Sequence, residues 1–521
     1  MQHPGGGGAA SRRMTQQADK AARLMITLAV MSATLIQVLD TTIVNVALPH
    51  MQGELGATTD QISWVLTSYL VTAAIFMPLT GYFSDILGRK RYLLMCIAGF
   101  VGASALCGIA ANVVEIVLFR MLQGMFGAAL VPLSQAIMSD AYPPEERGRA
   151  MALWGLGVMV GPVLGPTLGG WLTEVASWRW TFYINVPVGA LSFFLASQFV
   201  PETGKKARKM DWPGLVLLAA GVAGTQYALD RGNQQDWLAA TDIRISTVLG
   251  VVGLAGFAWY SLRAKERALF DIRIFTDRNF ATACLVIALL GLGMFGTIVV
   301  QPILLERLLN YPILTTGMIM APRGIATAIS MLIVGRLVGR TDARVLVGAG
   351  MLISATGSHF MTRYSLDINA FWIIWPAMLQ GLGMGLIFVP LSTVAYATLP
   401  RARMAEAAGL YSLVRTMGSA VGISIVTTLL SRQGQVLWNE LGGHLTRFNP
   451  DVQHYLRGLH LRPDDPKAVA LMADQIARQA EMLAMLDVFQ LITWSFIVML
   501  PLVFLLKKQQ AGGAPMAVAA E

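Results

Sequence analysis

The chain has 521 residues, of which 55% are hydrophobic and 13% are charged, and its mean hydropathy is +0.58. Soluble globular domains carry roughly 25% charged residues, so this composition excludes a mostly water-facing surface and indicates an integral membrane protein. The net charge of +9 would suggest a nucleic-acid partner only in a soluble chain, so no nucleic acid is expected here.

Fourteen apolar segments follow one another, separated by charged residues, glycine and proline. Each is close to the roughly 20 residues that an α-helix needs to cross a bilayer, whereas barrel strands are shorter and alternate in polarity. We therefore predict an all-α integral membrane fold with 14 transmembrane helices. They lie at residues 24–49, 60–81, 92–111, 114–137, 149–173, 179–200, 212–230, 244–262, 280–305, 314–335, 345–362, 369–396, 405–431 and 486–506.

The basic residues set the orientation of these segments. With both ends of the chain in the cytoplasm, the tails and inner connectors hold 25 lysines and arginines, against five in the short outer connectors. Cytoplasmic connectors of membrane proteins carry this excess of basic residues. We therefore predict cytoplasmic tails at 1–23 and 507–521.

Two basic connectors, at 205–209 and 263–278, divide the segments into groups of six, two and six. Two pseudo-symmetric halves are the usual arrangement in transporters, with the substrate site between them near the middle of the bilayer. We predict an N-terminal six-helix bundle at 24–200, an inserted two-helix hairpin at 211–262, and a C-terminal six-helix bundle at 280–506 that includes a long outer loop at 432–485.

Four charged residues lie deep within the predicted spans. Asp40 is in the first span, Arg120 in the fourth, and Arg323 and Arg415 are near the middle of spans in the second bundle. A charge in hydrocarbon is costly, so Asp40 and Arg120 are expected to pair with each other or to face a wet cavity. For Arg323 and Arg415 the alternative is a structural bond to helix carbonyls.

The connector between spans two and three reads Gly-Tyr-Phe-Ser-Asp-Ile-Leu-Gly-Arg-Lys-Arg at 81–91. Gly81 permits close helix contact, and Asp85 brings a carboxylate to a membrane edge, where it can meet the positive end of another helix. The alternative for the basic run at 89–91 is that it only sets the topology.

Span five repeats glycine every fourth residue, which predicts one smooth helix face that another helix can approach closely. Prolines beside this face weaken the helix enough to allow bending. The alternative is small-residue packing without a role in coupling. The residues are Gly157, Gly161, Pro162, Gly165, Pro166 and Gly169.

These strings resemble those of the major facilitator superfamily, and in particular its fourteen-span drug:proton antiporters of the EmrB/QacA type. Besides the connector at 81–91 and the glycine repeat of span five, four further strings carry this resemblance. They are Leu-Asp-Thr-Thr-Ile-Val-Asn-Val-Ala-Leu-Pro at 39–49, Arg-Met-Leu-Gln-Gly at 120–124, Trp-Arg-Trp-Thr-Phe-Tyr-Ile-Asn-Val-Pro at 178–187 and Arg-Thr-Met-Gly at 415–418. The resemblance covers nearly the whole chain and is strongest to the EmrB-like pumps. It implies proton-driven multidrug efflux of lipophilic molecules across the bacterial inner membrane by alternating access.

Two other functions are alternatives to drug efflux. A proton-coupled exporter of one specific metabolite would share these motifs. A membrane enzyme is disfavoured, because the sequence has no metal cluster, nucleophile triad or phosphate-binding loop, and no cofactor is expected.

The resemblance, together with burial of charge, suggests roles for single residues. Asp40 is the candidate proton carrier and Arg120 its partner; the alternative is a permanent pair that only holds the bundle together. Asp85 is expected to latch the halves through span 13, with Arg89 pairing with Asp140. The candidate substrate route comprises Asn45, Gln123, Arg323 and Arg415; the gate comprises Gly81, Asp85, Gly88, Arg89 and Asp140; and the glycine and proline residues of span five form the antiporter helix.

The outer segment 432–485 is much longer than the other connectors. Its stretches 434–445 and 466–485 can form amphipathic helices, which favours docking of a partner. In EmrB-like relatives the partners are a periplasmic adaptor and an outer-membrane channel, whereas QacA-like relatives work without them. We favour the version with an adaptor.

Overall fold

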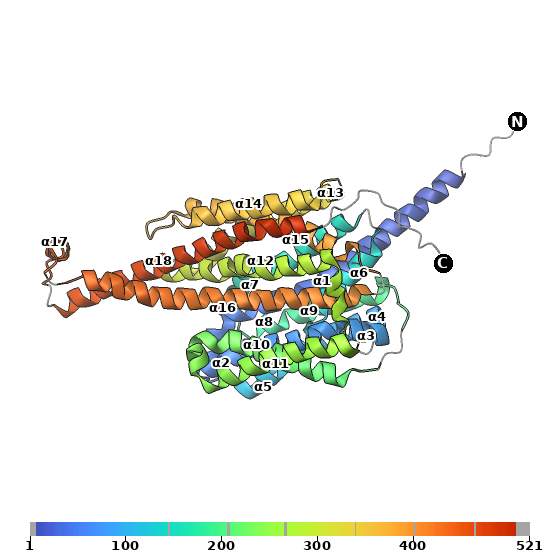
Figure 1. The fold of residues 1–521 in the computed structure, drawn as a ribbon, viewed down its shortest axis with the longest axis horizontal. Coiled ribbons are helices and arrows are strands. Elements are labelled where there is room, and N and C mark those ends of the chain that lie inside the picture. The colour runs from blue at the N-terminus through green and yellow to red at the C-terminus, as the bar shows by residue number, and fades with distance from the viewer. Residues whose placement is uncertain are drawn as a thin grey trace.

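The computed structural model describes residues 7–143, 146–205, 209–264, 268–338, 340–400, 403–446, 448–462 and 465–506. Over this part of the chain it is built from helices, with a single isolated β-bridge and no strand, which confirms the all-α prediction (Figure 1). The tail predicted at 507–521 and the first six residues lie outside the described residues.

The described residues of the N-terminal half form ten helical elements. Spans two and four are each divided, the former by the 3-10 turn around Pro78, because proline removes one hydrogen bond of a helix. The elements are α1 (Gly7–Glu54), α2 (Thr59–Phe76), η1 (Met77–Leu79), α3 (Thr80–Leu87), α4 (Arg89–Ile109), α5 (Val113–Gly127), α6 (Leu130–Ala141), α7 (Arg147–Val175), α8 (Trp180–Tyr183) and α9 (Asn185–Phe199). Thus α1 begins within the predicted tail at 1–23, whose alanines, glutamines and lysine favour helix.

The inserted hairpin consists of α10 (Trp212–Arg231) and α11 (Thr241–Ala264), joined by η3 (Gly232–Gln235) and η4 (Trp237–Ala239). The carboxylate of Asp211 caps α10 by accepting from the Gly214 N–H, and it also accepts from the Tyr260 hydroxyl and the Leu269 N–H. One buried acid therefore joins the start of α10, the end of α11 and the segment that follows.

The C-terminal half contains η6 (Ile272–Thr276), α12 (Arg278–Ile303), η7 (Leu304–Leu308), α13 (Ile313–Leu337), α14 (Ala343–Met361), α15 (Ala370–Ala397), α16 (Met404–His444), α17 (Pro450–Gly458), α18 (Pro466–Met499) and η9 (Leu500–Leu505). Among the described residues, twelve helices are long and apolar enough to cross a membrane. The other two predicted spans, 149–173 and 345–362, are helices α7 and α14.

The two halves pack in two places, where α7 lies against α13 and α15 and where α16 lies against α2, η1, α3 and α6. The hairpin lies beside this junction, because α10 contacts both α2 and α16. We call the end of the bundle that carries residues 88–91 the basic end.

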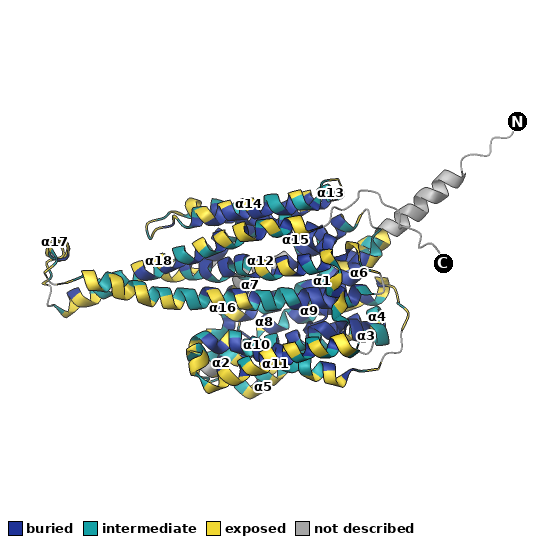
Figure 2. Cartoon of the chain, in the orientation of Figure 1, coloured by how far each residue is buried: buried dark blue, intermediate teal, exposed yellow. Residues whose placement is uncertain are grey.

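At the opposite end, α16 and α18 continue beyond the bundle, and α17 lies at the far tip (Figure 1). We call the described residues of 432–485 the stalk. The 41 residues of α16 span about 60 Å, twice the roughly 30 Å of a hydrocarbon core. Side chains along the stalk are largely exposed or half-buried (Figure 2). The stretches 434–445 and 466–485 are thus continuations of the membrane helices.

Candidate functional site

Asp40 on α1 and Arg120 on α5 form an ion pair inside the N-terminal half. The Arg120 Nη1 donates to the Asp40 Oδ2 at 2.6 Å, and the exposed fractions of the two side chains are 1% and 0%. Removing two charges from water is costly unless they are paired and their remaining hydrogen bonds are satisfied. The surroundings of this pair meet that requirement.

Three neighbours complete the hydrogen bonds of the pair. The Gln123 Nε2 donates to the Asp40 Oδ1 at 2.9 Å, while its Oε1 accepts from the Arg120 Nη1 at 2.7 Å. The Arg120 Nε donates to the Val65 carbonyl at 3.0 Å, and the Asn185 Nδ2 donates to the Asp40 Oδ1 at 3.2 Å. Charge-assisted bonds of this kind are the strong ones in a protein interior. Helices α1, α2, α5 and α9 are therefore tied together at one buried point.

Tyr69 on α2 separates this ion pair from a cavity between the halves. The Arg120 guanidinium lies 4.2 Å from the centre of the Tyr69 ring, a cation–π contact. The Tyr69 hydroxyl accepts from the Gln37 Nε2 at 3.3 Å, and both residues line the cavity. On α1, Val38, Thr41 and Thr42 line it as well, so Asp40 is adjacent in the chain to the cavity wall without being part of it.

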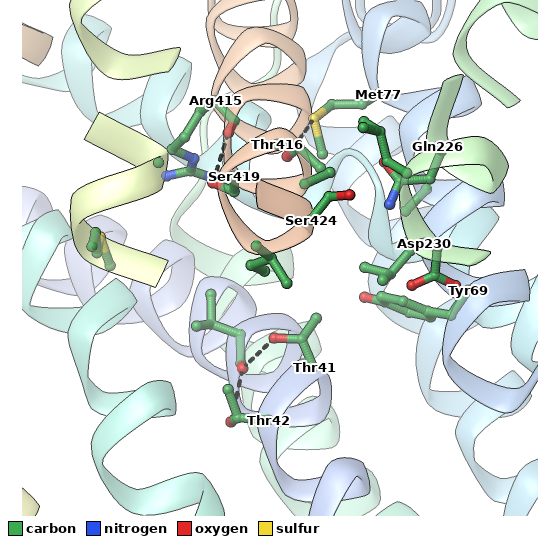
Figure 3. Close-up of a pocket in the computed structure, with 18 of the residues that line it drawn as sticks. Thr41, Thr42, Tyr69, Met77, Gln226, Asp230, Arg415, Thr416, Ser419 and Ser424 are labelled. Carbon is green, nitrogen blue, oxygen red and sulfur yellow. Dashed lines mark hydrogen bonds between the residues drawn. The ribbon is translucent and has the colours of Figure 1, made fainter. Parts of the chain in front are cut away.

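The cavity has a volume of about 500 Å³ and is lined by α1, α2, α7, α10, α12, α15 and α16 (Figure 3). Its lining is mostly apolar, with a few polar groups, as is typical of a small-molecule site. The polar and charged residues come mainly from three helices: Gln37, Thr41 and Thr42 of α1; Gln226 and Asp230 of α10; and Arg415, Thr416, Ser419, Ser424 and Thr427 of α16.

Of the four residues predicted on the substrate route, Arg415 lies in the cavity wall. Arg323 is 8% exposed, and its Nη2 donates to the Met294 carbonyl at 3.4 Å. Gln123 belongs to the buried ion-pair network. Asn45 is exposed on α1 and donates to the Thr41 carbonyl at 3.4 Å. The structure therefore places these four residues in four different settings.

Arg415 differs from Arg120 in its surroundings. It makes no ion pair with any residue that the structure describes, although its guanidinium lies in the cavity wall. The hydroxyl of Ser419, one turn further along α16, donates to the backbone carbonyl of Arg415 at 2.8 Å. This bond does not involve the Arg415 guanidinium. The cavity thus contains a cation that the described part of the protein does not neutralise by an ion pair.

The predicted gate residues lie at the basic end, where the halves touch. A methyl group on Gly81 would lie 2.9 Å from the Cα of Glu406 on α16, so only glycine permits this approach. Asp85 lies on the same short helix, α3, and interacts electrostatically with Arg89. Gly88 joins α3 to α4 with φ of 81°, a conformation that other residues rarely adopt.

Arg89 pairs with Asp140 at the end of α6. The Arg89 backbone N–H also donates to the Thr203 hydroxyl at 2.9 Å, which ties the start of α4 to the connector after α9. A second contact between the halves lies nearby: a methyl group on Gly148 of α7 would meet the Val338 side chain at 2.7 Å. The basic end is therefore closely packed across the junction.

The glycine ladder of α7 faces α1 of its own half. Methyl groups on Gly161 and Gly169 would lie 2.6 Å from Val38 and 2.7 Å from the Ile43 carbonyl, and Gly157 and Gly165 face Met31 and Thr42. Other positions of α7 contact α13 of the second half. The helix lies at the junction as expected, but its ladder packs within the N-terminal half. Pro162 and Pro166 also fall in α7.

A model of the Major Facilitator Superfamily matches residues 30–423. The chain belongs to this superfamily. It is 34% identical over 490 residues to the fatty acid resistance protein FarB of Neisseria gonorrhoeae, with 94% of this chain and 96% of that protein covered. The same identity, over 498 residues and the same coverage, relates it to the multidrug export protein EmrB of Escherichia coli K12. These relatives confirm an EmrB-like transporter of the superfamily.

Solved structures of the superfamily share its fold. The human organic anion transporter MFSD10 matches with a TM-score of 0.57 at 15% identity, covering 92% of this chain and 99% of that one. The proton:xylose symporter XylE matches with a TM-score of 0.59 at 14% identity, covering 91% and 96%. The family match and the relatives, together with the long apolar helices, identify a multi-pass membrane transporter and not an enzyme. Among the described residues, no group of three or more His, Cys, Asp or Glu is arranged to hold a metal ion.

Sequence reasoning missed several residues of the site. Asn185 stands in one of the strings that carry the family resemblance, but nothing in the string indicates that its amide reaches Asp40. Gln226 and Asp230 belong to the hairpin, and Asp230 falls at the very end of a predicted span, where an acid usually faces water. For Gln123 a signal existed, because a residue three positions after Arg120 shares its helix face.

Proposed function

We propose that this transporter exports lipophilic small molecules across the bacterial inner membrane by alternating access, driven by protons. The observation that carries the proposal is the position of the cavity between two halves that are joined at one end. The relatives FarB and EmrB, which match over nearly their whole length, are named for resistance to fatty acids and for multidrug export. Their names support efflux of apolar molecules here.

We place the basic end in the cytoplasm, because its connectors carry the excess of basic residues. The close contacts Gly81–Glu406 and Gly148–Val338 then close the cytoplasmic side. Cavity-lining residues such as Asn233, Gln234 and Thr427 come from the half of α10, η3 and α16 nearer the stalk. This arrangement fits a protein that has delivered its substrate toward the outer side.

Asp40 is the proposed proton carrier. Its carboxylate is the buried acid that pairs with Arg120, and Tyr69 lies between that arginine and the cavity. A proton on Asp40 removes the charge attraction that holds Arg120, so the guanidinium keeps its hydrogen bonds to Val65 and Gln123 and its ring contacts with Tyr69 and Phe182. The helices α1, α2 and α5 are then free to shift against one another, which links protonation to the shape of the cavity wall.

The test of this function is a drug-susceptibility panel on cells with and without the protein, repeated with an ionophore that collapses the proton gradient. Resistance to lipophilic compounds should depend on the protein and should disappear with the gradient. Purified protein in proteoliposomes should pump the same compounds when an inward proton gradient is imposed. Export that persists unchanged without any gradient would contradict the proposal.

The charge of the cavity narrows the substrate class. Arg415 supplies an unneutralised cation, so neutral or weakly acidic lipophiles should be exported better than divalent cations. Resistance to dicationic disinfectants without resistance to weak acids would reverse this assignment.

The stalk is the proposed docking site for a periplasmic adaptor, which in turn would reach an outer-membrane channel. The stalk projects beyond the bundle, and its helices leave apolar side chains such as Val436, Trp438 and Val469 exposed. Replacing residues 445–475 by a short linker should leave membrane insertion intact but weaken resistance in cells with a full Gram-negative envelope. Unchanged resistance and unchanged adaptor crosslinking would show that the stalk is not the docking site.

A further inference from the structure

The inserted hairpin contributes directly to the cavity wall. Helix α10 lies beside the junction of the halves, and Gln226, Leu229 and Asp230 line the cavity opposite α1 and α16. Figure 3 shows Gln226 and Asp230 on α10 facing the helix that carries Arg415, Ser419 and Ser424. The hairpin is therefore more than a connector between the two bundles.

Two of these cavity-lining residues have buried polar atoms without a partner. Gln226 is 4% exposed, and its Oε1 accepts no hydrogen bond from a described residue. Ser424 on the facing helix is 3% exposed, and its Oγ is likewise without a described partner. Polar atoms that are buried and unpaired are costly, and a ligand with hydrogen-bonding groups would satisfy them.

Asp230 adds a negative charge to the same wall. The Thr67 hydroxyl of α2 donates to its Oδ2, which fixes the carboxylate, and Asp230 makes no ion pair with a described residue. A contact between the tilted rings of Tyr227 and Trp64, whose centres are 5.7 Å apart, holds the same part of α10 against α2. An anionic group is thus held in place at the cavity wall.

Asp230 and Arg415 stand at different depths. The starts of α10 and α16 are joined at the basic end, because Asp211 accepts from the Leu269 N–H and the Asp271 N–H donates to Glu406. Counting 1.5 Å per residue from these points, Asp230 lies about 10–15 Å closer to the stalk than Arg415. The cavity therefore has a cationic site at mid-depth and an anionic site nearer the stalk, with apolar walls between them.

We propose that α10 is a specificity element, in which Asp230 and Gln226 bind the protonated amine of an amphiphilic substrate whose acidic group lies at Arg415. The ammonium donates to the Asp230 carboxylate and to the Gln226 carbonyl oxygen, and the apolar body lies against residues such as Leu290 and Ile423. This assignment rests on the proposed export of lipophilic molecules and names the substrate class for the same cavity.

The probes are a quinolone carboxylic acid with a free piperazine amine and its N-acetyl derivative, which keeps the acid and the ring but loses the positive charge. Dissociation constants are measured on the full-length protein in lipid nanodiscs. The parent protein should prefer the free amine by about fivefold, because a partly exposed ion pair contributes modestly. Asp230→Asn, which retains an acceptor for Thr67, should abolish this preference.

Asp242→Asn is the matched control. It removes the same charge from the same hairpin, and both residues are exposed, but Asp242 on α11 accepts from the Tyr227 hydroxyl instead of lining the cavity. This variant should keep the preference for the amine. Thermal unfolding of both variants in detergent shows whether the hairpin remains folded.

The outcomes separate this inference from the broader function. An unchanged preference in Asp230→Asn, or an equal loss in Asp242→Asn, would overturn the role of Asp230 even if both probes are pumped in proteoliposomes. Equal affinity of the parent protein for the two probes would overturn it as well. Absence of proton-driven export for any lipophilic compound, with selective amine binding retained, would contradict the proposed function and not the binding site.

Discussion

The two halves of the molecule treat buried charge in opposite ways. In the N-terminal half, Arg120 has a carboxylate partner at 2.6 Å and also donates to the Val65 carbonyl and to Gln123. In the C-terminal half, Arg323 donates to a carbonyl and Arg415 faces the cavity, without a described acid beside either. A neutralised pair suits a proton switch inside one bundle, whereas an unneutralised cation in a cavity suits recognition of a ligand.

The largest effect is expected from Arg120→Leu. This change leaves the Asp40 carboxylate buried without its cation, and breaking one partner of a buried pair costs about 3–5 kcal/mol. We expect a large loss of folded protein in the membrane, measured by fluorescence-detected chromatography and by thermal unfolding in detergent. A variant with parental stability would mean that the pair contributes little to the N-terminal half.

Asp40→Asn should have a smaller effect on folding and a large one on transport. The amide keeps the size of the carboxylate and still accepts from Gln123, but it cannot carry a proton through the cycle. We expect normal membrane level, retained drug binding and loss of efflux driven by an imposed proton gradient. If Asp40→Asn still pumps drug against its gradient at nearly the parental rate, the Asp40–Arg120 pair has only a structural role.

Arg415→Gln tests the other half of the contrast. Removing the cavity cation should weaken binding of a lipophilic carboxylic acid by about tenfold, as expected for one charge-assisted bond of about 1.4 kcal/mol, and should affect its methyl ester less. Arg323→Gln is the matched control, because that arginine lies outside the lining of the cavity. Equal losses in both variants would indicate a general structural effect of the arginines.

The smallest effect is expected from Asn185→Leu. It removes one donor to Asp40 and the bond of 3.1 Å to the Ser104 hydroxyl, while the ion pair and Gln123 remain. We expect a loss of about 1 kcal/mol of stability with proton-driven efflux retained. A loss as large as that in Arg120→Leu would mean that the network depends on the amide as much as on the charge.

The sequence predicted the membrane helices well, because a long apolar stretch has few alternatives in a bilayer. It predicted less about the helix faces. The sequence assigns Gln123 to the substrate route, yet this residue shares the buried face of Arg120. Asn45, five residues after Asp40, is exposed. Which face of a helix meets which neighbour depends on packing between segments far apart in the chain, as Asn185 and Asp40 illustrate at 145 residues of separation.

The cavity could not be predicted for the same reason. Gln226 and Asp230 gain their setting from the position of α10 against α2 and α16, which the basic connectors on either side of the hairpin do not specify. The closeness of Gly81 to Glu406 was easier to anticipate, since a glycine in that connector already indicated a close helix contact.

Helix α16 runs without interruption from Glu406 at the basic end, past Arg415 in the cavity, to His444 in the stalk. It is therefore one continuous rod, whose short part runs from Arg415 to the gate and whose long part runs from Arg415 through the rest of the bundle into the stalk. From Arg415 to His444 the long part measures about 44 Å, so each degree of tilt at the cavity moves the stalk tip by about 0.8 Å. If α16 tilts as a rigid body during transport, a protein bound to the tip moves with it, and a protein that immobilises the tip holds the gate in one position.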